Sequence, residues 1–233
     1  MTLPGALPLY QQIAELLIRV IAAGRLTEGE KLPPERDMAA GLGIAVGTLR
    51  AALKSLTEMG LVDRVQGSGN YIRARADTSS VYALFRLERV AGGGLPTARV
   101  LSVDRRVKDP RLPKFGTHVE GHRIRRLRLL SGQVAAVEEI WLDAAYVDDI
   151  AISDLSESLY LYYRQRLGLW IARAEDSIGQ GPLPDWSPAE FPHPPGTLLP
   201  FITRKSWGPD GQSAEASFTW YDSDTVRYVA RLK

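Results

Sequence analysis

The chain has 233 residues, of which 45% are hydrophobic and 24% are charged, a composition typical of a globular protein with enough apolar material for two domains. It contains no cysteine, which excludes a disulfide framework and thiolate metal sites. No apolar run of about 18 residues and no secretory leader is found, so we expect a cytoplasmic protein without a membrane partner. The net charge of +2 is too small to indicate a nucleic-acid-binding protein without a motif.

Three stretches with helical spacing open the chain. Helices are predicted over Leu9–Ala23 and over residues 34–42, where Pro34 suits a first helical turn. A third helix is predicted over Val46–Gly60, because four apolar residues recur at the spacing of one buried helix face. These four residues are Leu49, Ala52, Leu53 and Leu56.

A hairpin is predicted directly after the third helix. Its strands are Leu61–Gln66 and Tyr71–Arg73, and its tip, Gly67-Ser68-Gly69, allows the chain to approach a sugar-phosphate backbone closely. The tip is also half of a dinucleotide-binding fingerprint, but no third glycine and no helix follow it. This order of elements is typical of a winged helix-turn-helix, which places the N-terminal part of its second helix in the DNA major groove.

Short matches to one family run through residues 32–69. They are Leu32-Pro33, Glu35-Arg36, Leu42-Gly43, Thr48-Leu49-Arg50, Ala52-Leu53, Gly60-Leu61-Val62 and Gly67-Ser68-Gly69. This part of the chain resembles the GntR family of bacterial transcription regulators. It departs from the family at Ala45 and Val46, where a Ser and an Arg usually stand, so a side-chain cap and one polar DNA contact are missing.

The resemblance implies which side chains touch DNA. Arg36 and Arg50 are expected to contact bases or phosphates, together with Thr48 and the tip glycines Gly67 and Gly69. Two simpler interpretations stay open. The two arginines can be solvated helix residues, and the Thr48 hydroxyl can bond its own backbone.

A second domain is predicted after a short polar linker. We place a DNA-binding domain at residues 1–75, the linker at 76–80 and the second domain at 81–233. Beyond the linker the apolar pattern alternates, which predicts an antiparallel sheet and an α+β chain overall. Asp154 and Glu157 suit a capping box for a helix that ends before Gly168. The predicted strands are Val100–Val107, His122–Leu130, Gln133–Leu142, Leu198–Trp207 and Gln212–Asp222.

Three stretches of this domain have a common resemblance: RRLRLLSGQVAAVEEIWL, SLYLYYRQRLGL and TRKSWGPDGQSAEASFTWYDSD. They resemble the UTRA effector domain, the chorismate-lyase-like module of the HutC branch of GntR regulators. Residues 180–196, with six prolines, depart from that pattern, and the sequence does not tell whether they gate a pocket. The resemblance implies an effector site made of Arg126, Arg128, Glu138, Ser158, Tyr160 and Tyr221.

The chemistry of these residues suits a small polar ligand. Two arginines on one strand form a fork for a carboxylate or a phosphate, and a glutamate binds hydroxyl or ammonium groups. Tyrosines supply an apolar wall with a polar tip. The alternative is a solvated ladder of charged residues.

The turn between Arg126 and Glu138 decides whether the two side chains share a face of the sheet. A two-residue turn, Ser131-Gly132, would place Arg126 opposite Val137 and Glu138 on the other face. A three-residue turn with a bulge would place Arg126 opposite Ala136 and bring Glu138 to the arginine side. A shared effector site requires the second geometry.

The two resemblances together predict a transcription repressor that binds double-stranded operator DNA as a homodimer and is controlled by an anionic or zwitterionic metabolite. We expect no cofactor and no metal, because Gly116 and Gly121 disfavour a helix that would join His118 and His122. No nucleophile, base and orienting residue stand at a recognisable spacing, so we expect no enzyme. A chorismate-lyase-like enzyme and a ligand-independent DNA-binding protein are the alternatives.

Overall fold

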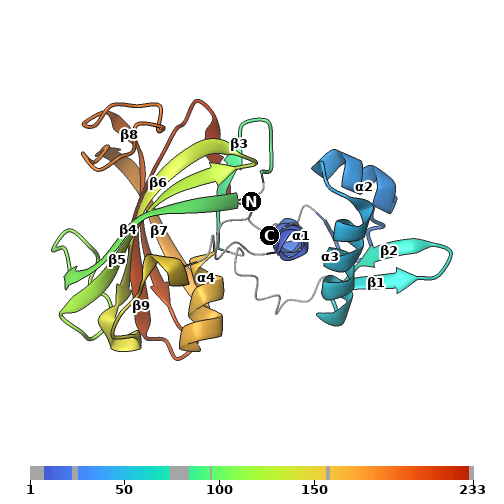
Figure 1. Ribbon diagram of the computed structural model, residues 1–233, viewed down its shortest axis with the longest axis horizontal. Helices are drawn as coiled ribbons and strands as arrows, with labels where there is room; N and C mark the ends of the chain where they lie inside the picture. The colour runs from blue at the N-terminus through green and yellow to red at the C-terminus, as the bar shows by residue number, and fades with distance from the viewer. Residues whose placement is uncertain (1–7, 23–25, 74–83, 95, 156–157, 231–233) are drawn as a thin grey trace. The chain divides into compact units, whose positions relative to one another are not determined.

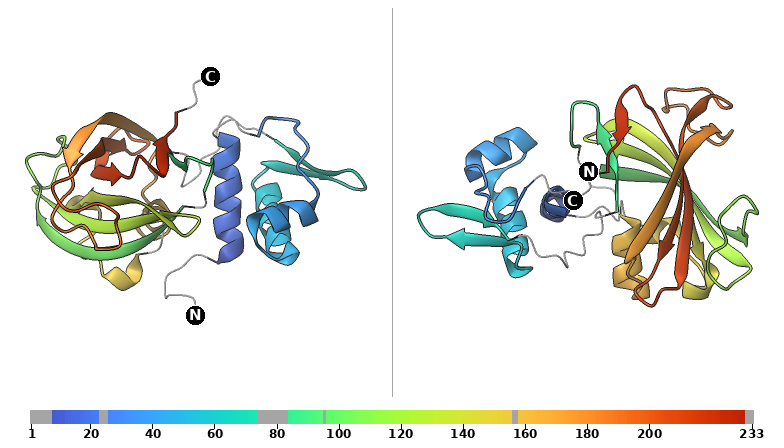
Figure 2. Two further views of the ribbon diagram at one scale, coloured as in Figure 1. Left: turned by 90° about the horizontal axis from the view of Figure 1, so that it is seen from above. Right: turned by 180° about the vertical axis from the view of Figure 1, so that it is seen from behind.

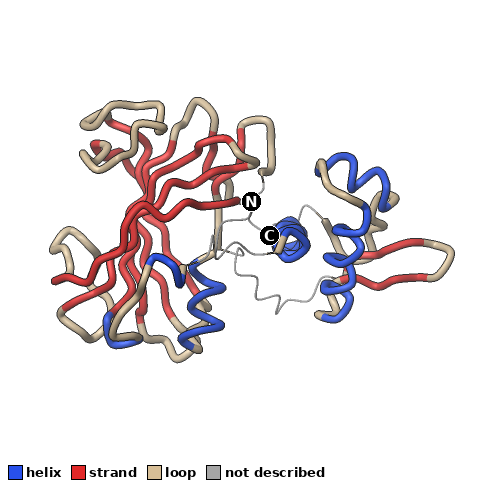
Figure 3. The backbone as a smooth tube through the Cα atoms, viewed as in Figure 1, coloured by secondary structure: helices blue, strands red, loops and turns tan. Residues whose placement is uncertain are grey.

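The computed structural model describes residues 8–22, 26–73, 84–94, 96–155 and 158–230. The chain divides into two compact units that meet in the sequence between Phe85 and Arg86. The N-terminal unit is mostly helical and the C-terminal unit is mostly strand (Figure 1, Figure 3), as the sequence predicts. The predicted linker at residues 76–80 lies outside the described residues, as does Ala23.

The N-terminal unit consists of three helices and a hairpin. They are α1 (Leu9–Ala22), α2 (Glu35–Leu42), α3 (Val46–Glu58), β1 (Val62–Val65) and β2 (Gly69–Ile72). The axes of α2 and α3 differ by 109°, which is the crossing expected of a helix-turn-helix. No described helix is by itself long and apolar enough to cross a membrane, and α2 and α3 meet the length and composition criteria only when they are taken together.

The helix ends follow from local chemistry. Gly43 adopts a left-handed φ of 68° and ends α2, a conformation that glycine reaches without steric cost. Pro34 is the N-cap of α2 rather than part of its first turn, and Ala45 caps α3 without a side-chain hydrogen bond. The departure from the family at position 45 therefore removes a cap, as predicted.

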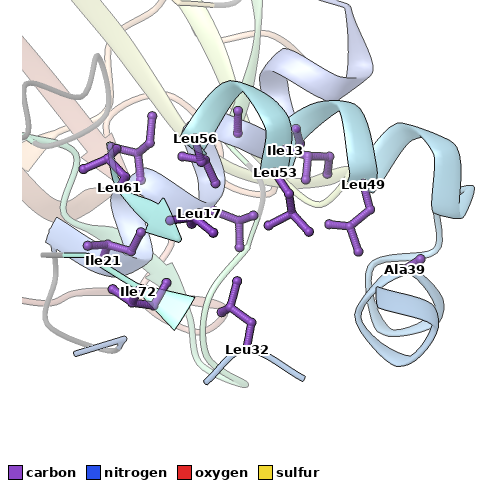
Figure 4. Close-up of a cluster of buried hydrophobic side chains, with 14 residues drawn as sticks. Ile13, Leu17, Ile21, Leu32, Ala39, Leu49, Leu53, Leu56, Leu61 and Ile72 are labelled. Carbon is purple, nitrogen blue, oxygen red and sulfur yellow. The ribbon is translucent and has the colours of Figure 1, made fainter. Parts of the chain in front are cut away.

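The predicted apolar face of α3 forms the centre of the N-terminal core. Leu49, Ala52, Leu53 and Leu56 are at most 3% exposed and belong to a cluster with residues of α1 and of the hairpin (Figure 4). Burial of such side chains is the main source of stability for a small helical unit.

The C-terminal unit is built on a twisted antiparallel sheet of six strands in the order β4-β5-β6-β9-β8-β7 (Figure 2). A separate pair joins β3 (Leu87–Arg89) to β10 (Val226–Tyr228). Five of the six strands overlap the predicted ones, and β7 was not predicted. The six strands are β4 (Pro96–Val107), β5 (Glu120–Leu130), β6 (Gln133–Asp143), β7 (Arg173–Pro182), β8 (Leu198–Trp207) and β9 (Ser213–Tyr221).

The predicted capping box at Asp154 is wrong. The Asp154 carboxylate accepts a hydrogen bond from the Ala151 amide at 3.1 Å and so closes its own 3-10 turn, and Glu157 lies outside the described residues. The helix α4 (Leu159–Tyr162) begins instead after Ser158, continues as a π-helical segment, η3 (Tyr163–Leu167), and ends at Gly168 as predicted. The 3-10 turn closed by Asp154 is η2 (Ile152–Asp154), and another 3-10 turn, η1 (Ala144–Tyr146), precedes it.

The β5–β6 hairpin has a turn different from the one that a shared site was expected to need. Ser131 and Gly132 have φ values of 51° and 80°, which indicates a tight two-residue turn. The extra residue lies further along, because the pairing skips Ala135 and so places Arg126 opposite Glu138. A bulge reverses the alternation of side chains beyond it, so the predicted partner of Arg126 is wrong whereas the predicted common face is correct.

The two faces of the sheet have different contents. One face carries the main apolar core, which includes Val137, Trp141, Phe218 and Trp220. The proline-rich residues 180–196 complete that core, because Leu183 and Phe191 are buried within it. Since side chains alternate along a strand, Arg126 and Glu138 point to the opposite face, where the Tyr160 hydroxyl of α4 donates to Glu215 of β9 at 3.0 Å.

Candidate DNA-contact and effector sites

The predicted DNA-contact residues lie on α2, on α3 and at the tip of the hairpin. Arg36 and Arg50 are exposed and Thr48 is half-buried. Arg36 lines a groove between the start of α2 and the hairpin, together with the basic residues Lys31 and Arg64. An exposed, basic groove beside a recognition helix is suited to a phosphate backbone.

The tip glycines Gly67 and Gly69 adopt backbone conformations that favour glycine. Gly67 and Gly69 have φ values of 76° and 127°, a region that other residues enter only with strain. A Cβ atom at Gly69 would lie 3.2 Å from the Lys31 side chain. The hairpin therefore requires glycine at both positions for conformational reasons, whether or not DNA is bound.

Arg50 is held by an ion pair that the sequence did not reveal. Its Nε donates to Glu35 Oε2 at 2.6 Å, with the arginine side chain 61% exposed and the glutamate 19% exposed. The hydrogen bond from Arg50 lowers the pKa of Glu35. The Asn70 amide of β2 donates to the other carboxylate oxygen at 3.5 Å.

The predicted effector residues Arg126, Arg128 and Glu138 form one buried cluster. Arg126 donates to Glu138 Oε2 through Nε at 3.0 Å and Nη2 at 2.7 Å. Arg128 donates through Nε to Oε1 at 3.2 Å and through Nη2 to Oε2 at 3.0 Å. All three residues are at most 6% exposed, so the alternative of a solvated charged ladder does not describe them.

This cluster places one glutamate between two arginines. Burial alone would raise the pKa of Glu138, but the guanidinium groups of Arg126 and Arg128 outweigh it and lower that pKa to about 2. One ionised carboxylate thus faces two guanidinium groups. Arg126 Nη1 is buried and makes no hydrogen bond within the part of the chain that the structure describes, and such a buried donor is costly unless something accepts from it.

The other three predicted effector residues are less directly placed. Ser158 is buried and caps α4, since its hydroxyl accepts from the Leu161 amide at 3.3 Å. Tyr160 directs its hydroxyl to Glu215 and to Ser206. Tyr221, 8% exposed, lies opposite Ala136 on the strand next to β6, one cross-strand row from Glu138.

Sequence reasoning missed a second polar cluster on the same face. Glu215 Oε1 accepts from Tyr160 at 3.0 Å and from Ser206 at 3.1 Å, and burial raises the pKa of Glu215. Nearby, Arg204 forms a paired contact with Asp176 at 2.6 and 2.7 Å. Glu215 lies on the same face of β9 as Tyr221, and this alternation in the sequence could have predicted that Glu215 faces the effector residues.

The histidines that were weighed as metal ligands have other partners. His118 lies before β5, where its Nδ1 accepts from the Glu120 amide at 3.0 Å, and His122 Nε2 contacts the Val147 carbonyl oxygen at 2.8 Å. Across the described ranges, no group of three or more His, Cys, Asp or Glu side chains has an arrangement that could hold a metal ion.

Comparison with known families matches both units. Residues 9–72 match the family of bacterial regulatory proteins named gntR, and residues 91–227 match the UTRA domain. The chain belongs to the GntR family. Its C-terminal unit is a UTRA domain, so this GntR protein is a transcription regulator with the two-domain arrangement of the HutC branch.

Two relatives that are named transcriptional regulators align with this GntR protein over nearly the whole length of both chains. The HTH-type transcriptional regulator SmoD of Agrobacterium fabrum is 61% identical over 229 residues, which cover 98% of both chains. The HTH-type transcriptional repressor NagR of Bacillus subtilis is 24% identical and covers 97% of this chain and 96% of its own. The crystal structure of the possible transcriptional regulator YydK from Bacillus subtilis superposes with a TM-score of 0.52 at 21% identity, covering 97% of this chain and all of that one, and it supports the fold.

Proposed function

We propose that this GntR regulator is a repressor whose operator affinity is controlled by a small anionic or zwitterionic metabolite bound beside Arg126. The observation that carries the proposal is the buried cluster of two arginines and one glutamate. A buried guanidinium nitrogen without an acceptor is costly. A bound carboxylate or phosphate accepts from Arg126 Nη1, which makes no hydrogen bond within the described chain.

Two relatives support the repressor role. NagR is named a repressor, and MngR of Escherichia coli, 27% identical over 75% of each chain, is named the repressor of a mannosyl-D-glycerate transport and metabolism system. For this chain we infer the same direction of control. The ligand acts on DNA binding only if it has different affinities for the DNA-competent and DNA-incompetent states.

The effector is sought by thermal shift with acidic sugars, amino acids, phosphonates and histidine-pathway acids, because specific binding raises the melting temperature with ligand concentration. For any acid that binds, we expect Arg126→Ala to remove the ligand-dependent shift. The control is Arg125→Ala, which removes the same charge from the opposite face, where Arg125 pairs with Glu139 at 2.8 Å. A shift that Arg126→Ala leaves intact would place the effector elsewhere.

A turnover assay and an operator-binding assay with the same acid separate the proposal from its two alternatives. An enzyme on this fold would consume the bound acid and would retain that activity after Arg50→Ala. A ligand-independent DNA-binding protein would keep its operator affinity when the acid saturates the C-terminal unit. We expect neither result, because the pocket is proposed to bind without turnover and to transmit binding to the DNA-binding unit.

We also propose that the regulator is a homodimer through its C-terminal unit. A palindromic operator is read by two recognition helices related by a two-fold axis. The ten-residue strand β7 lies at one edge of the six-stranded sheet, and its Ile178 is 53% exposed. Strand edges of this length favour pairing with another chain.

We expect Ile178→Lys to convert the dimer to a monomer, because a charge at the paired edge opposes strand addition. Light scattering after size-exclusion chromatography measures the mass directly. The matched control is Val119→Lys, since Val119 is also highly exposed, at 67%, but precedes β5. If Ile178→Lys remains a dimer, this edge is not the interface.

A further inference from the structure

Glu35 is an acidic residue that lies among several basic residues of the DNA-binding unit. It begins α2, next to Arg36 and close in space to Arg50 and Arg64. Acidic residues at helix N-termini are favourable for the helix dipole, and Asp37 in the same first turn needs no other explanation. Glu35 differs from Asp37 because its carboxylate is engaged by two other elements of the fold.

The carboxylate of Glu35 joins the recognition helix to the hairpin. One oxygen accepts from Arg50 Nε of α3 at 2.6 Å, and the other accepts from Asn70 Nδ2 of β2 at 3.5 Å. Asn70 is only 7% exposed, and its backbone carbonyl oxygen accepts from the Leu32 amide at 2.8 Å. The acceptor for Arg50 thus also contacts a buried residue of the hairpin.

Arg50 needs such an anchor. Its side chain is 61% exposed, and among the described residues it donates hydrogen bonds through Nε only. A long exposed side chain loses much conformational freedom when it binds a partner, and a guanidinium fork reads a base well only in a fixed orientation. Pairing through Nε restricts that orientation, and the two terminal amino groups make no hydrogen bond among the described residues.

We propose that Glu35 is a positioning residue for DNA recognition: it holds the Arg50 guanidinium between α2, α3 and the hairpin in the orientation that reads the operator. The proposal rests on the DNA-contact role proposed for Arg50.

Charge and positioning predict opposite effects for removal of this carboxylate. Phosphates repel a nearby carboxylate, so on charge alone Glu35→Ala would strengthen binding to every DNA sequence. Positioning predicts that the same substitution weakens operator binding by roughly tenfold, within the range of one arginine–base contact, while binding to a scrambled duplex stays equal or rises.

The experiment uses the full chain and a duplex selected with the unaltered protein from a random-sequence pool. Binding is measured against a scrambled duplex of equal length for Glu35→Ala, for the length-preserving Glu35→Gln, and for Asp37→Ala as control. Asp37→Ala removes the same charge from the same helix turn and should not weaken operator binding. Thermal melting tests whether each variant is folded. If Glu35→Ala is unfolded, Glu35→Gln is used in its place.

The outcomes separate the two proposals. Selective loss of operator binding in the Glu35 variants, with Asp37→Ala unaffected, supports positioning. Tighter operator binding in the Glu35 variants, or an equal loss in Asp37→Ala, overturns it. Arg50→Ala is measured in the same assay. If it keeps full operator binding, the DNA-contact role of Arg50 is wrong, and the role of Glu35 is wrong with it. If Arg50→Ala loses operator binding but the Glu35 variants do not, only the role of Glu35 is wrong.

Discussion

Arg50→Ala is expected to abolish operator binding at physiological salt, with a loss of roughly 100-fold or more, at the upper end for one arginine–base contact. The start of α3 offers no polar side chain at Ala45 or Val46, so few groups remain to read bases. Arg50 is the exposed guanidinium in the middle of that helix. Fluorescence anisotropy with the selected duplex and with a scrambled one measures the loss.

Lys54→Ala is the control for loss of charge on the same helix. Lys54 is 79% exposed, and its ion pair with Glu58 is long, at 3.9 Å. Lys54→Ala should therefore weaken binding to the selected and the scrambled duplex equally, and only a few-fold. Because Arg50 is exposed, its substitution should change the free energy of unfolding by less than about 0.5 kcal/mol. Operator affinity close to that of the unaltered protein would show that the reading face lies elsewhere.

The helices and their buried faces were predictable because each depends on residues within a few turns of one another. The i, i+3, i+4, i+7 spacing of α3 determines its buried face whatever it packs against. The ion pair between Glu35 and Arg50 was not predictable in this way. It joins residues 15 positions apart, and they meet only because α2 and α3 cross at the turn between them.

In the C-terminal sheet, too, an element that depends on distant residues was not predicted from the sequence. Strand alternation predicted β4, β5, β6, β8 and β9, but β7 is an edge strand rich in small and polar residues and has no clear apolar alternation. Its place is determined by pairing with β8. Pairing of this kind depends on distant residues that a local pattern does not contain.

The common face of Arg126 and Glu138 was predicted through resemblance, and the local reasoning about the turn was wrong. The tight turn at Ser131-Gly132 alone would have separated the two side chains. The bulge at Ala135 restores the common face, and no residue type at that position signals a bulge. Which of Ser158, Tyr160 and Tyr221 touch the effector stays a prediction, since they come from different elements joined only by tertiary packing.

Glu138→Gln is expected to destabilise the C-terminal unit by about 3 kcal/mol at pH 7, because two buried guanidinium groups lose their ionised partner. The folded-state pKa of about 2 lies below the ordinary value of 4.5. A lowered pKa means that the stabilisation is fully present above about pH 4.5 and is lost as the pH falls toward 2; the difference corresponds to about 3 kcal/mol.

Urea unfolding from pH 7 to pH 3 measures this effect through tryptophan fluorescence. All five tryptophans lie between residues 141 and 220, so the signal reports the C-terminal unit. The difference in the free energy of unfolding between the unaltered protein and Glu138→Gln should become smaller as the pH falls. Glu190→Gln is the control, because Glu190 is 57% exposed in its pair with Arg99 and should change stability by less than about 1 kcal/mol at any pH.

The same variant distinguishes the two kinds of effector. Glu138→Gln removes the negative charge of the buried cluster, so a purely anionic ligand should bind more tightly while the unliganded protein becomes less stable. A zwitterionic ligand that places its ammonium group on Glu138 should instead lose affinity in step with stability. We expect the first pattern, because both carboxylate oxygens of Glu138 already accept from Arg126 and Arg128 and are poorly placed to hold an ammonium group as well.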